Sequence, residues 1–140
     1  MANDATLTAR VYGLKAGDYQ LVNSWWRRHN ESDLPETMLP PLGVMVEQDG
    51  EPIVALWCYE CFGIGVCFLE WPCSRPGLDR KQATEAFGYA LKACIALAKS
   101  HGDYSVFRCS TLAPIARVLP KFGFLPEHGG HRYNFMLRSN

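Results

Sequence analysis

One long amphipathic segment between two strand-like runs limits the folds open to this chain. From Asp79 to about Ser100, apolar residues recur at the i, i+3, i+4 and i+7 spacing of one helix face, and Gly102 is a typical residue after a helix end. Strand-like runs lie on either side, at residues 64–71 and 104–109. A helix that joins neighbouring strands of one sheet is a crossover, so we expect these two strands to be parallel.

The rest of the pattern predicts further strands and two shorter helices. Alternating apolar and polar residues are typical of half-buried strands, and Asp49-Gly50 is a typical tight hairpin turn. Strands are expected at residues 6–12, 43–47, 53–59, 64–71, 104–109, 124–125 and 132–137. Besides the long helix, helices are expected after Asp18 and after Ser110 or Thr111, and residues 30–41 and 72–77 are expected to be irregular.

This order predicts a mixed α/β (α+β) fold, in which a mostly antiparallel sheet of six or seven strands is flanked by three or four helices. A chain of 140 residues is long enough for one domain of ordinary size, so residues 1–140 are expected to form a single domain. The expected parallel pair, residues 64–71 and 104–109, lies inside this sheet.

The composition restricts the partners and the compartment. The 14 basic and 14 acidic residues balance, so the chain has no overall field that would attract nucleic acid or an anionic membrane. Its apolar runs are too short to cross a bilayer, and its first residues do not have the pattern of a signal peptide. Six cysteines without a secretion signal are expected to be reduced thiols. We therefore expect a cytoplasmic protein that binds neither nucleic acid nor membranes.

The loop before the long helix is the first candidate site. A helix N-terminus presents unpaired N–H groups and partial positive charge, which favour a phosphate or a pyrophosphate. Three cations, Arg75, Arg80 and Lys81, lie beside those groups in this sequence. The alternative interpretation is an ordinary capped helix whose charged side chains are solvated.

The element order, this loop and the segment Lys121-Phe122-Gly123-Phe124 resemble the GNAT family of acetyl-CoA-dependent N-acetyltransferases, over nearly the whole chain from Thr6 to Leu137. In that family a [Q/R]-x-x-G-x-[G/A] loop wraps the pyrophosphate of coenzyme A. The pantetheine arm enters a V-shaped gap between the fourth and fifth strands. The resemblance therefore implies that the parallel strands 64–71 and 104–109 splay apart and that acetyl-CoA is the co-substrate.

The resemblance also implies which residues hold acetyl-CoA. Backbone groups of Phe68, Leu69 and Glu70 would hold pantetheine, and Ser110 would hydrogen-bond the cofactor, although Ser110 is also a typical helix cap. The residues that would hold the pyrophosphate are those of the loop and the first helical turn: Arg75, Gly77, Leu78, Asp79, Arg80 and Lys81.

Three positions depart from the family pattern. With Arg75 at the first position of the loop motif, Leu78 and Arg80 stand where the family has small residues, and their side chains would crowd the backbone. Leu119 stands where the family often has a tyrosine that acts as a general acid. Gly123-Phe124 does match the family. Small, divergent GNAT-like proteins of this kind are similar to some that bacteriophages encode.

Two residues are the candidate catalytic groups. Amine acetylation needs a group that takes a proton from the amine and a donor for the leaving thiolate. Glu70 is the candidate base, because it ends an apolar strand beside the expected gap and its burial would raise the pKa of the carboxyl. Its alternative role is an edge carboxylate paired with Arg75. Tyr133 is the candidate acid, and its alternative role is a half-buried strand aromatic.

Other reactive side chains suggest weaker alternatives. Four cysteines would be candidates for a zinc site, but we interpret them as packed thiols and expect no metal; they are Cys58, Cys61, Cys67 and Cys73. Cys109, at the end of the strand that borders the gap, is a conceivable nucleophile, with a structural thiol as its alternative. His128 and His131 lie in a region that often borders the acceptor site in the family, and they could contact a substrate.

Two functions follow from these residues. The first is an N-acetyltransferase that transfers the acetyl group directly to an amine of a small molecule or a protein, with the acidic segment 31–36 facing a cationic acceptor. The second is a GNAT-like protein without catalysis that acts as a CoA-binding or protein-interaction module, as the altered loop and the missing tyrosine suggest. The acceptor and the oligomeric state, monomer or homodimer, stay open.

Overall fold

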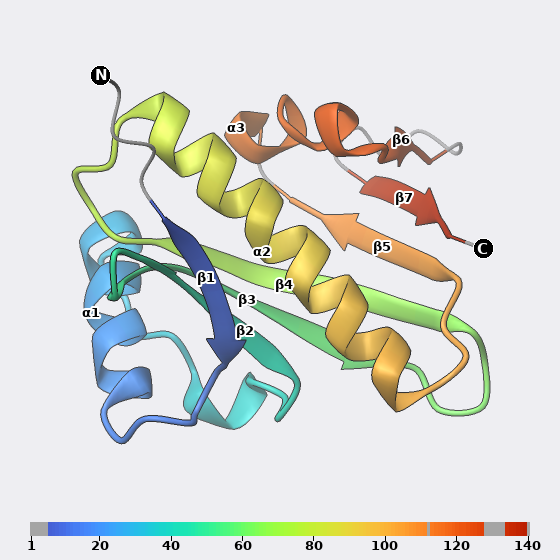
Figure 1. The fold of residues 1–140 in the computed structure, drawn as a ribbon, viewed down its shortest axis with the longest axis horizontal. Coiled ribbons are helices and arrows are strands. Elements are labelled where there is room, and N and C mark those ends of the chain that lie inside the picture. Colours follow the sequence, from blue (N-terminus) through green and yellow to red (C-terminus); the bar gives the residue numbers. More distant parts are fainter. Residues whose placement is uncertain (1–5, 112, 128–133, 140) are drawn as a thin grey trace.

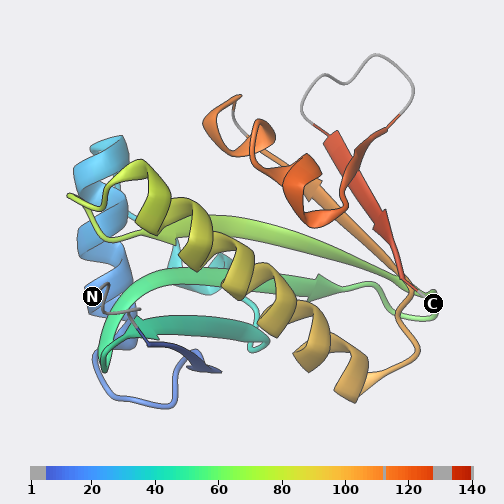
Figure 2. The ribbon, with the colours of Figure 1, turned by 45° about the horizontal axis from the view of Figure 1, so that its top comes forward.

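The computed structural model describes residues 6–111, 113–127 and 134–139, which form a seven-stranded sheet with helices packed against it (Figures 1 and 2). The elements in chain order are β1 (Leu7–Val11), α1 (Asp18–Asn30), the 3₁₀ helix η1 (Glu36–Met38), β2 (Gly43–Gln48), β3 (Glu51–Glu60), β4 (Val66–Ser74), α2 (Arg80–His101), β5 (Val106–Ser110), α3 (Ala113–Ala116), the 3₁₀ helix η2 (Leu119–Phe122), β6 (Leu125–Pro126) and β7 (Asn134–Arg138).

The strand order is β1-β2-β3-β4-β5-β7-β6, and β4 and β5 are the parallel neighbours, whereas the other neighbours are antiparallel. The predicted mixed fold and its parallel pair are therefore confirmed. The parallel direction arises because α2 carries the chain back along the sheet between β4 and β5 (Figure 1). Within the described ranges, no helix combines the length and the apolar character needed to cross a bilayer.

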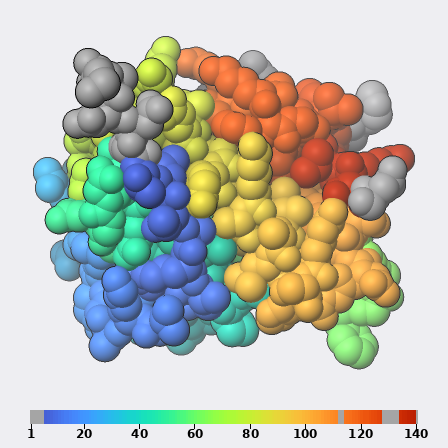
Figure 3. Space-filling model, viewed as in Figure 1, coloured from blue at the N-terminus to red at the C-terminus, as the bar shows by residue number. Residues whose placement is uncertain are grey.

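Alternate residues of the central strands pack against different helices. On β3, Leu56 and Cys58 belong to the apolar cluster that includes α2, whereas Ala55 and Trp57 belong to the cluster that includes α1. This alternation is the two-residue period of a strand whose two faces are both covered. Figure 3 shows α2, in yellow to orange, crossing one face of the molecule beside the C-terminal segment in orange to red.

The first hairpin agrees with its sequence signal. Gln48 pairs with Glu51, so the turn consists of Asp49 and Gly50, whose φ angles are 50° and 84°. Positive φ at both central residues is what a type I′ turn requires, and Asp-Gly adopts it at low cost. The predicted tight hairpin is confirmed.

The predicted loop at residues 72–77 is wrong for its first three residues, because β4 continues to Ser74. Trp57 pairs with Glu70 and Ala55 pairs with Cys73, so Trp71 and Pro72 together lie opposite one residue of β3. This is a β-bulge, and Trp71 has a φ of 60° in it. A proline is tolerated at a bulge because the ladder needs no N–H there.

Other boundaries also differ from the expectations. Ser110 is the last residue of β5 and α3 begins only at Ala113, so the predicted role of Ser110 as a helix cap is wrong. The long helix begins next to Asp79, where the sequence predicts its start. The side chains of Asp79 and Gln82 form a reciprocal capping box there. Tertiary pairing with β7 extends β5 beyond the end that its own sequence pattern suggests.

Candidate functional site

The parallel strands β4 and β5 separate soon after they begin. They are paired at Val66–Val106, Cys67–Phe107 and Phe68–Arg108. Beyond Phe68, β4 stays paired with β3, whereas the end of β5 stays paired with β7. Figure 2 shows β5 and β7 rising away from β4 from a common end. The predicted splayed pair is therefore confirmed, and it leaves one edge of β4 without a sheet partner.

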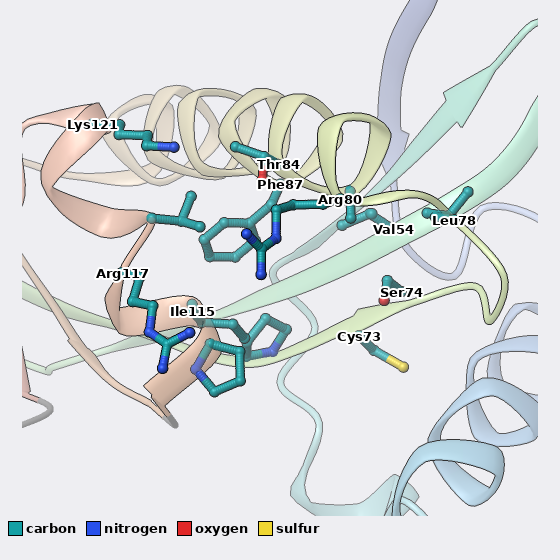
Figure 4. A pocket seen from close by; sticks show the side chains of 14 residues that line it. Val54, Cys73, Ser74, Leu78, Arg80, Thr84, Phe87, Ile115, Arg117 and Lys121 are labelled. Carbon is teal, nitrogen blue, oxygen red and sulfur yellow. The ribbon is translucent and has the colours of Figure 1, made fainter.

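A cavity of about 530 Å³ lies beside the end of β4, between α2 and the segment from α3 to η2 (Figure 4). The α2 wall consists of Arg80, Ala83, Thr84 and Phe87, which share one helix face by their spacing. The opposite wall is formed by Pro114, Ile115, Arg117, Val118 and Lys121. Residues of β3, of the β4 end and of the following loop complete the lining: Val54, Pro72, Cys73, Ser74 and Leu78.

The charged side chains among these lining residues are all positive. Arg80 extends from the first turn of α2, and Arg117 and Lys121 come from the other wall (Figure 4). No described carboxylate lines the cavity. Cations that converge on a concave surface without a counter-charge attract anions, and guanidinium groups suit phosphate oxygens well.

The start of α2 adds backbone donors to this charge. The Asp79 carboxylate accepts a hydrogen bond from the Gln82 N–H at 2.8 Å, and the Asp79 N–H donates to the Gln82 side-chain oxygen at 3.3 Å. The amides of Arg80 and Lys81 have no hydrogen-bond partner among the described residues. The helix is therefore capped, as the alternative interpretation held, and two N–H groups are still available to an anion.

Only one of the three cations predicted around the loop lines the cavity. Arg80 and Leu78 line the cavity, whereas Arg75 and Lys81 do not. The Arg75 guanidinium lies 3.6 Å from the Glu51 carboxylate, and its backbone N–H donates to the Ile53 carbonyl. Arg75 thus ties the loop to β3. The roles predicted for Gly77, which has a φ of 90°, and for Asp79 and Ser110 in binding a cofactor stay predictions.

Arg117 and Lys121 are the cavity residues that the sequence reasoning missed. They are four residues apart, in the region where the sequence predicts one short helix, but Arg117 lies in the turn between α3 and η2 and Lys121 lies in η2. A basic pair at i, i+4 on a helix is usually a solvated face, so the spacing by itself indicates no site. The useful signal would have been the absence of any acidic residue between Thr111 and Pro126, which contrasts with the balanced charge of the whole chain.

Glu70 lies on the other face of the sheet, at the point where β4 and β5 separate. It pairs with Trp57 across the ladder, is half-buried, and burial raises the pKa of its carboxyl above the usual range. The alternative of a Glu70–Arg75 ion pair is wrong, since the carboxylate beside Arg75 is that of Glu51. Burial, with a contribution from the charge of Glu70, raises the pKa of Cys109 to about 12. The Cys109 thiol is therefore protonated and buried, which does not suit a nucleophile.

An aromatic group borders Glu70 on this face. The Trp71 indole N–H donates to the Tyr59 hydroxyl at 2.8 Å, and that hydroxyl donates to the Met38 carbonyl. Trp71 also packs edge-on against Trp26 of α1, with ring centroids 5.4 Å apart. These contacts hold the β4 bulge against α1 and η1. Tyr133, His128 and His131 lie outside the described residues.

On the next strand, a charged pair lies over Phe68. The Arg108 guanidinium is 5.0 Å from the Phe68 ring centroid and makes two hydrogen bonds, of 2.5 and 2.8 Å, with the Glu127 carboxylate. Because a carboxylate partner already binds the guanidinium, Arg108 differs from the cations of the cavity.

The cysteines are all free, and five of the six are buried. A hydrogen bond with Cys94, together with burial, raises the pKa of Cys58, and burial raises that of Cys67. Protonated thiols are poor metal ligands. In the part of the chain that the structure describes, no three or more His, Cys, Asp or Glu residues are grouped so that they could hold a metal ion.

No protein-family model matches the sequence, and no curated protein does either. Solved structures do match the fold. N-acetylglutamate synthase from Neisseria gonorrhoeae, complexed with coenzyme A and N-acetyl-glutamate, has a TM-score of 0.67 at 13% identity, over 99% of this chain. The chain spans 36% of the length of that synthase.

Two smaller proteins match over most of both chains. The GNAT family N-acetyltransferase YhbS from Escherichia coli, in complex with CoA, has a TM-score of 0.66 at 14% identity, over 99% of this chain and 84% of its own. An acyl-CoA N-acyltransferase from Pseudomonas aeruginosa has a TM-score of 0.60 at 14% identity, over 98% of this chain and 100% of its own. The chain therefore has the fold of the GNAT N-acetyltransferases, as the resemblance in its sequence implies.

Proposed function

We propose that this protein is an acetyl-CoA-dependent N-acetyltransferase that acts on an amine of a small molecule or a protein. The observation that carries the proposal is the cationic cavity at the end of β4, beyond the point where β4 and β5 separate. A fold shared with acetyltransferases is by itself weak support, because one fold serves many functions. The charge of the cavity and the open strand edge are features of this chain, and both suit acetyl-CoA.

Acetyl-CoA would lie along β4 and end at the start of α2. The unpaired edge of β4 offers the backbone groups of Phe68, Leu69 and Glu70 to the two amides of pantetheine, in the way that an extended peptide adds to a sheet edge. The diphosphate would bind the free amides of Arg80 and Lys81 and the Arg80 guanidinium. The Ser110 hydroxyl, at the end of β5, would contact the pantetheine arm.

The chemistry is a direct transfer. The neutral amine attacks the thioester carbonyl carbon, so a C–N bond forms as the C–S bond breaks. Glu70 accepts the proton that the amine loses, and its raised pKa makes it a better base than an exposed glutamate. The departing thiolate takes a proton from Tyr133, the donor predicted from the sequence. A covalent acyl-enzyme on Cys109 is disfavoured by the burial of that thiol.

Binding and transfer are tested separately. Titration calorimetry with acetyl-CoA should give micromolar affinity, and no detectable heat at millimolar ligand would contradict the proposal. Release of the CoA thiol is then followed with a panel of small amines and lysine peptides. Glu70→Gln should lower the transfer rate while CoA affinity is kept, whereas Glu85→Gln, which removes an exposed carboxylate outside the cavity, should change neither.

A second candidate function, CoA binding without catalysis, rests on the positions at which this chain departs from the GNAT pattern. Leu119 is fully buried at the position where the GNAT pattern often has a tyrosine, and the Leu78 and Arg80 side chains line the cavity where that pattern has small residues. A CoA-binding module without catalysis would keep the affinity for CoA but release no thiol with any amine of the panel. Equal binding of CoA and acetyl-CoA, together with unchanged acetyl-CoA after long incubation, would favour this function.

A further inference from the structure

We infer that Arg117 and Lys121 form a second phosphate subsite, which binds the 3′-phosphate of coenzyme A and so selects it over dephospho-coenzyme A. This inference rests on the proposed function and adds a specificity that the fold does not supply. It comes from the division of positive charge between the two walls of the cavity.

The two walls carry their cations on separate elements. Arg80 belongs to the first turn of α2, whereas Arg117 and Lys121 come from the α3–η2 segment across the cavity (Figure 4). One negatively charged group at the start of α2 would use Arg80 and the two free amides, and would leave the far pair without an anion. A ligand with two separate anionic groups can bind both walls.

The charge of the far pair is not neutralised by the described part of the chain. Four other arginines have carboxylate partners: Arg10 has Asp18, Arg27 has Asp33, Arg75 has Glu51, and Arg108 has Glu127. Arg117 and Lys121 have no such partner among the described residues, and both are exposed. Arg117 lies between α3 and η2 and Lys121 lies in η2, so both cations belong to one wall of the cavity. A phosphate monoester carries more charge than a single ion pair neutralises, so it can bind both of them.

The part of the cavity between the charged groups is largely apolar. Phe87 from one wall and Ile115 and Val118 from the other line it, with Thr84 as a small polar group (Figure 4). Coenzyme A has groups that match this lining: its ribose separates the diphosphate from the 3′-phosphate, and the adenine, which branches from the same ribose, can cover the apolar side chains between the charged groups. An inorganic diphosphate or a pantetheine phosphate has no group for the second wall.

The far wall is held at a defined distance from α2. Leu119 is fully buried, and the Phe122 ring lies so close to Gly88 that a Cβ at that glycine would be 2.2 Å from two ring atoms. Arg117 and Lys121 belong to this segment, so the places where their side chains leave the backbone are set before a ligand binds. Preorganisation of this kind reduces the entropic cost of binding.

The test compares coenzyme A with dephospho-coenzyme A by titration calorimetry. The intact protein should bind coenzyme A at least about tenfold more tightly, the effect of one charge-assisted contact. Arg117→Gln/Lys121→Gln should reduce that preference to nearly one by weakening coenzyme A only. Arg80→Gln should weaken both ligands equally. The control Arg28→Gln/Lys92→Gln removes two exposed positive charges outside the cavity and should keep the preference.

Each outcome decides between the two hypotheses. Binding of both ligands with equal affinity by the intact protein, or a preference that survives Arg117→Gln/Lys121→Gln, would overturn the subsite and leave the acetyltransferase proposal intact. Failure of both ligands to bind would overturn the proposed function itself. Lys121→Arg, which keeps the charge, should keep the preference. Thermal unfolding of each variant checks that the loss of preference is not a loss of fold.

Discussion

Gly88 is the position at which one added methyl group should reveal how the cavity wall is held. It lies inside α2, and a Cβ built on it would be 2.2 Å from the Cε1 and Cζ atoms of Phe122. Real Cβ atoms do not approach ring carbons so closely, so Gly88→Ala must displace the Phe122 ring and with it η2. The segment that carries Arg117 and Lys121 would then move away from α2.

Two opposing effects set the size of the change in stability. Alanine is favoured over glycine inside a helix by about 1 kcal/mol. Overpacking a filled interior typically costs about 1–3 kcal/mol. We therefore expect a net loss of about 1 kcal/mol, which for a domain of this size lowers Tm by roughly 3 °C. A similar loss of preorganisation would weaken the binding of coenzyme A by about fivefold.

The assay is a double-mutant cycle with Phe122→Leu, measured by urea unfolding and by titration with coenzyme A. Leucine is shorter than the phenylalanine ring, so Gly88→Ala should cost much less in the Phe122→Leu background and could stabilise the protein there. A higher Tm and unchanged coenzyme A affinity for Gly88→Ala in the natural background would refute the reasoning. In that case the ring would move freely, and the wall would not be held by this contact.

Three further experiments, on Glu70, on Arg10 and on the cysteines, have expected outcomes. The rate of transfer should fall as the pH is lowered through the pKa of Glu70, which burial raises above that of an ordinary glutamate, and a pH–rate profile of Glu70→Gln should lack this limb. The Arg10 guanidinium binds both carboxylate oxygens of Asp18 at 2.7 Å and the Glu47 carboxylate at 3.1 Å. Arg10→Met removes this partner from two buried carboxylates, so it should lower the free energy of unfolding, measured in urea, by about 3 kcal/mol. The hydrogen bond from Arg10 lowers the pKa of Asp18, so the ionised Asp18 stabilises the fold fully above the ordinary aspartate pKa, and this stabilisation is lost as the pH falls through the lowered pKa. The free energy of unfolding should therefore depend less on pH in the acid range for Arg10→Met than for the natural protein. An equal pH dependence of the two proteins would contradict this role of Arg10. A thiol reagent should label Cys61 quickly and the five buried cysteines only on unfolding, and a Cys61→Ser variant that still reacts quickly would disprove that assignment.

The elements themselves were largely predictable, because local signals and burial agree along most of the chain. The stripe of apolar residues after Asp79 predicts α2, and the Asp49-Gly50 turn predicts the register of its hairpin. The bulge at Trp71 was not predictable in this way. A proline after an apolar strand is a typical strand end, and only pairing with β3 on one side and an open edge on the other lets β4 continue through it.

The candidate site was predictable only in part. Arg80 lines the cavity, as its place in the loop suggests, but the equally basic Arg75 turns to Glu51, which is distant in the sequence and adjacent across the sheet. Arg117 and Lys121 were missed because it is a distant contact that brings them to the cavity. Their role depends on the wall that faces them, and no local pattern reports it.

By itself, the sequence determined where helices and strands form and which strand pair is parallel, because these follow from the spacing of apolar side chains and from the length of one connecting helix. Only the tertiary structure decided where that pair separates and which cations face the opening. Both depend on which partner each strand keeps and on which side chains from distant segments meet, and such contacts are set by packing in three dimensions.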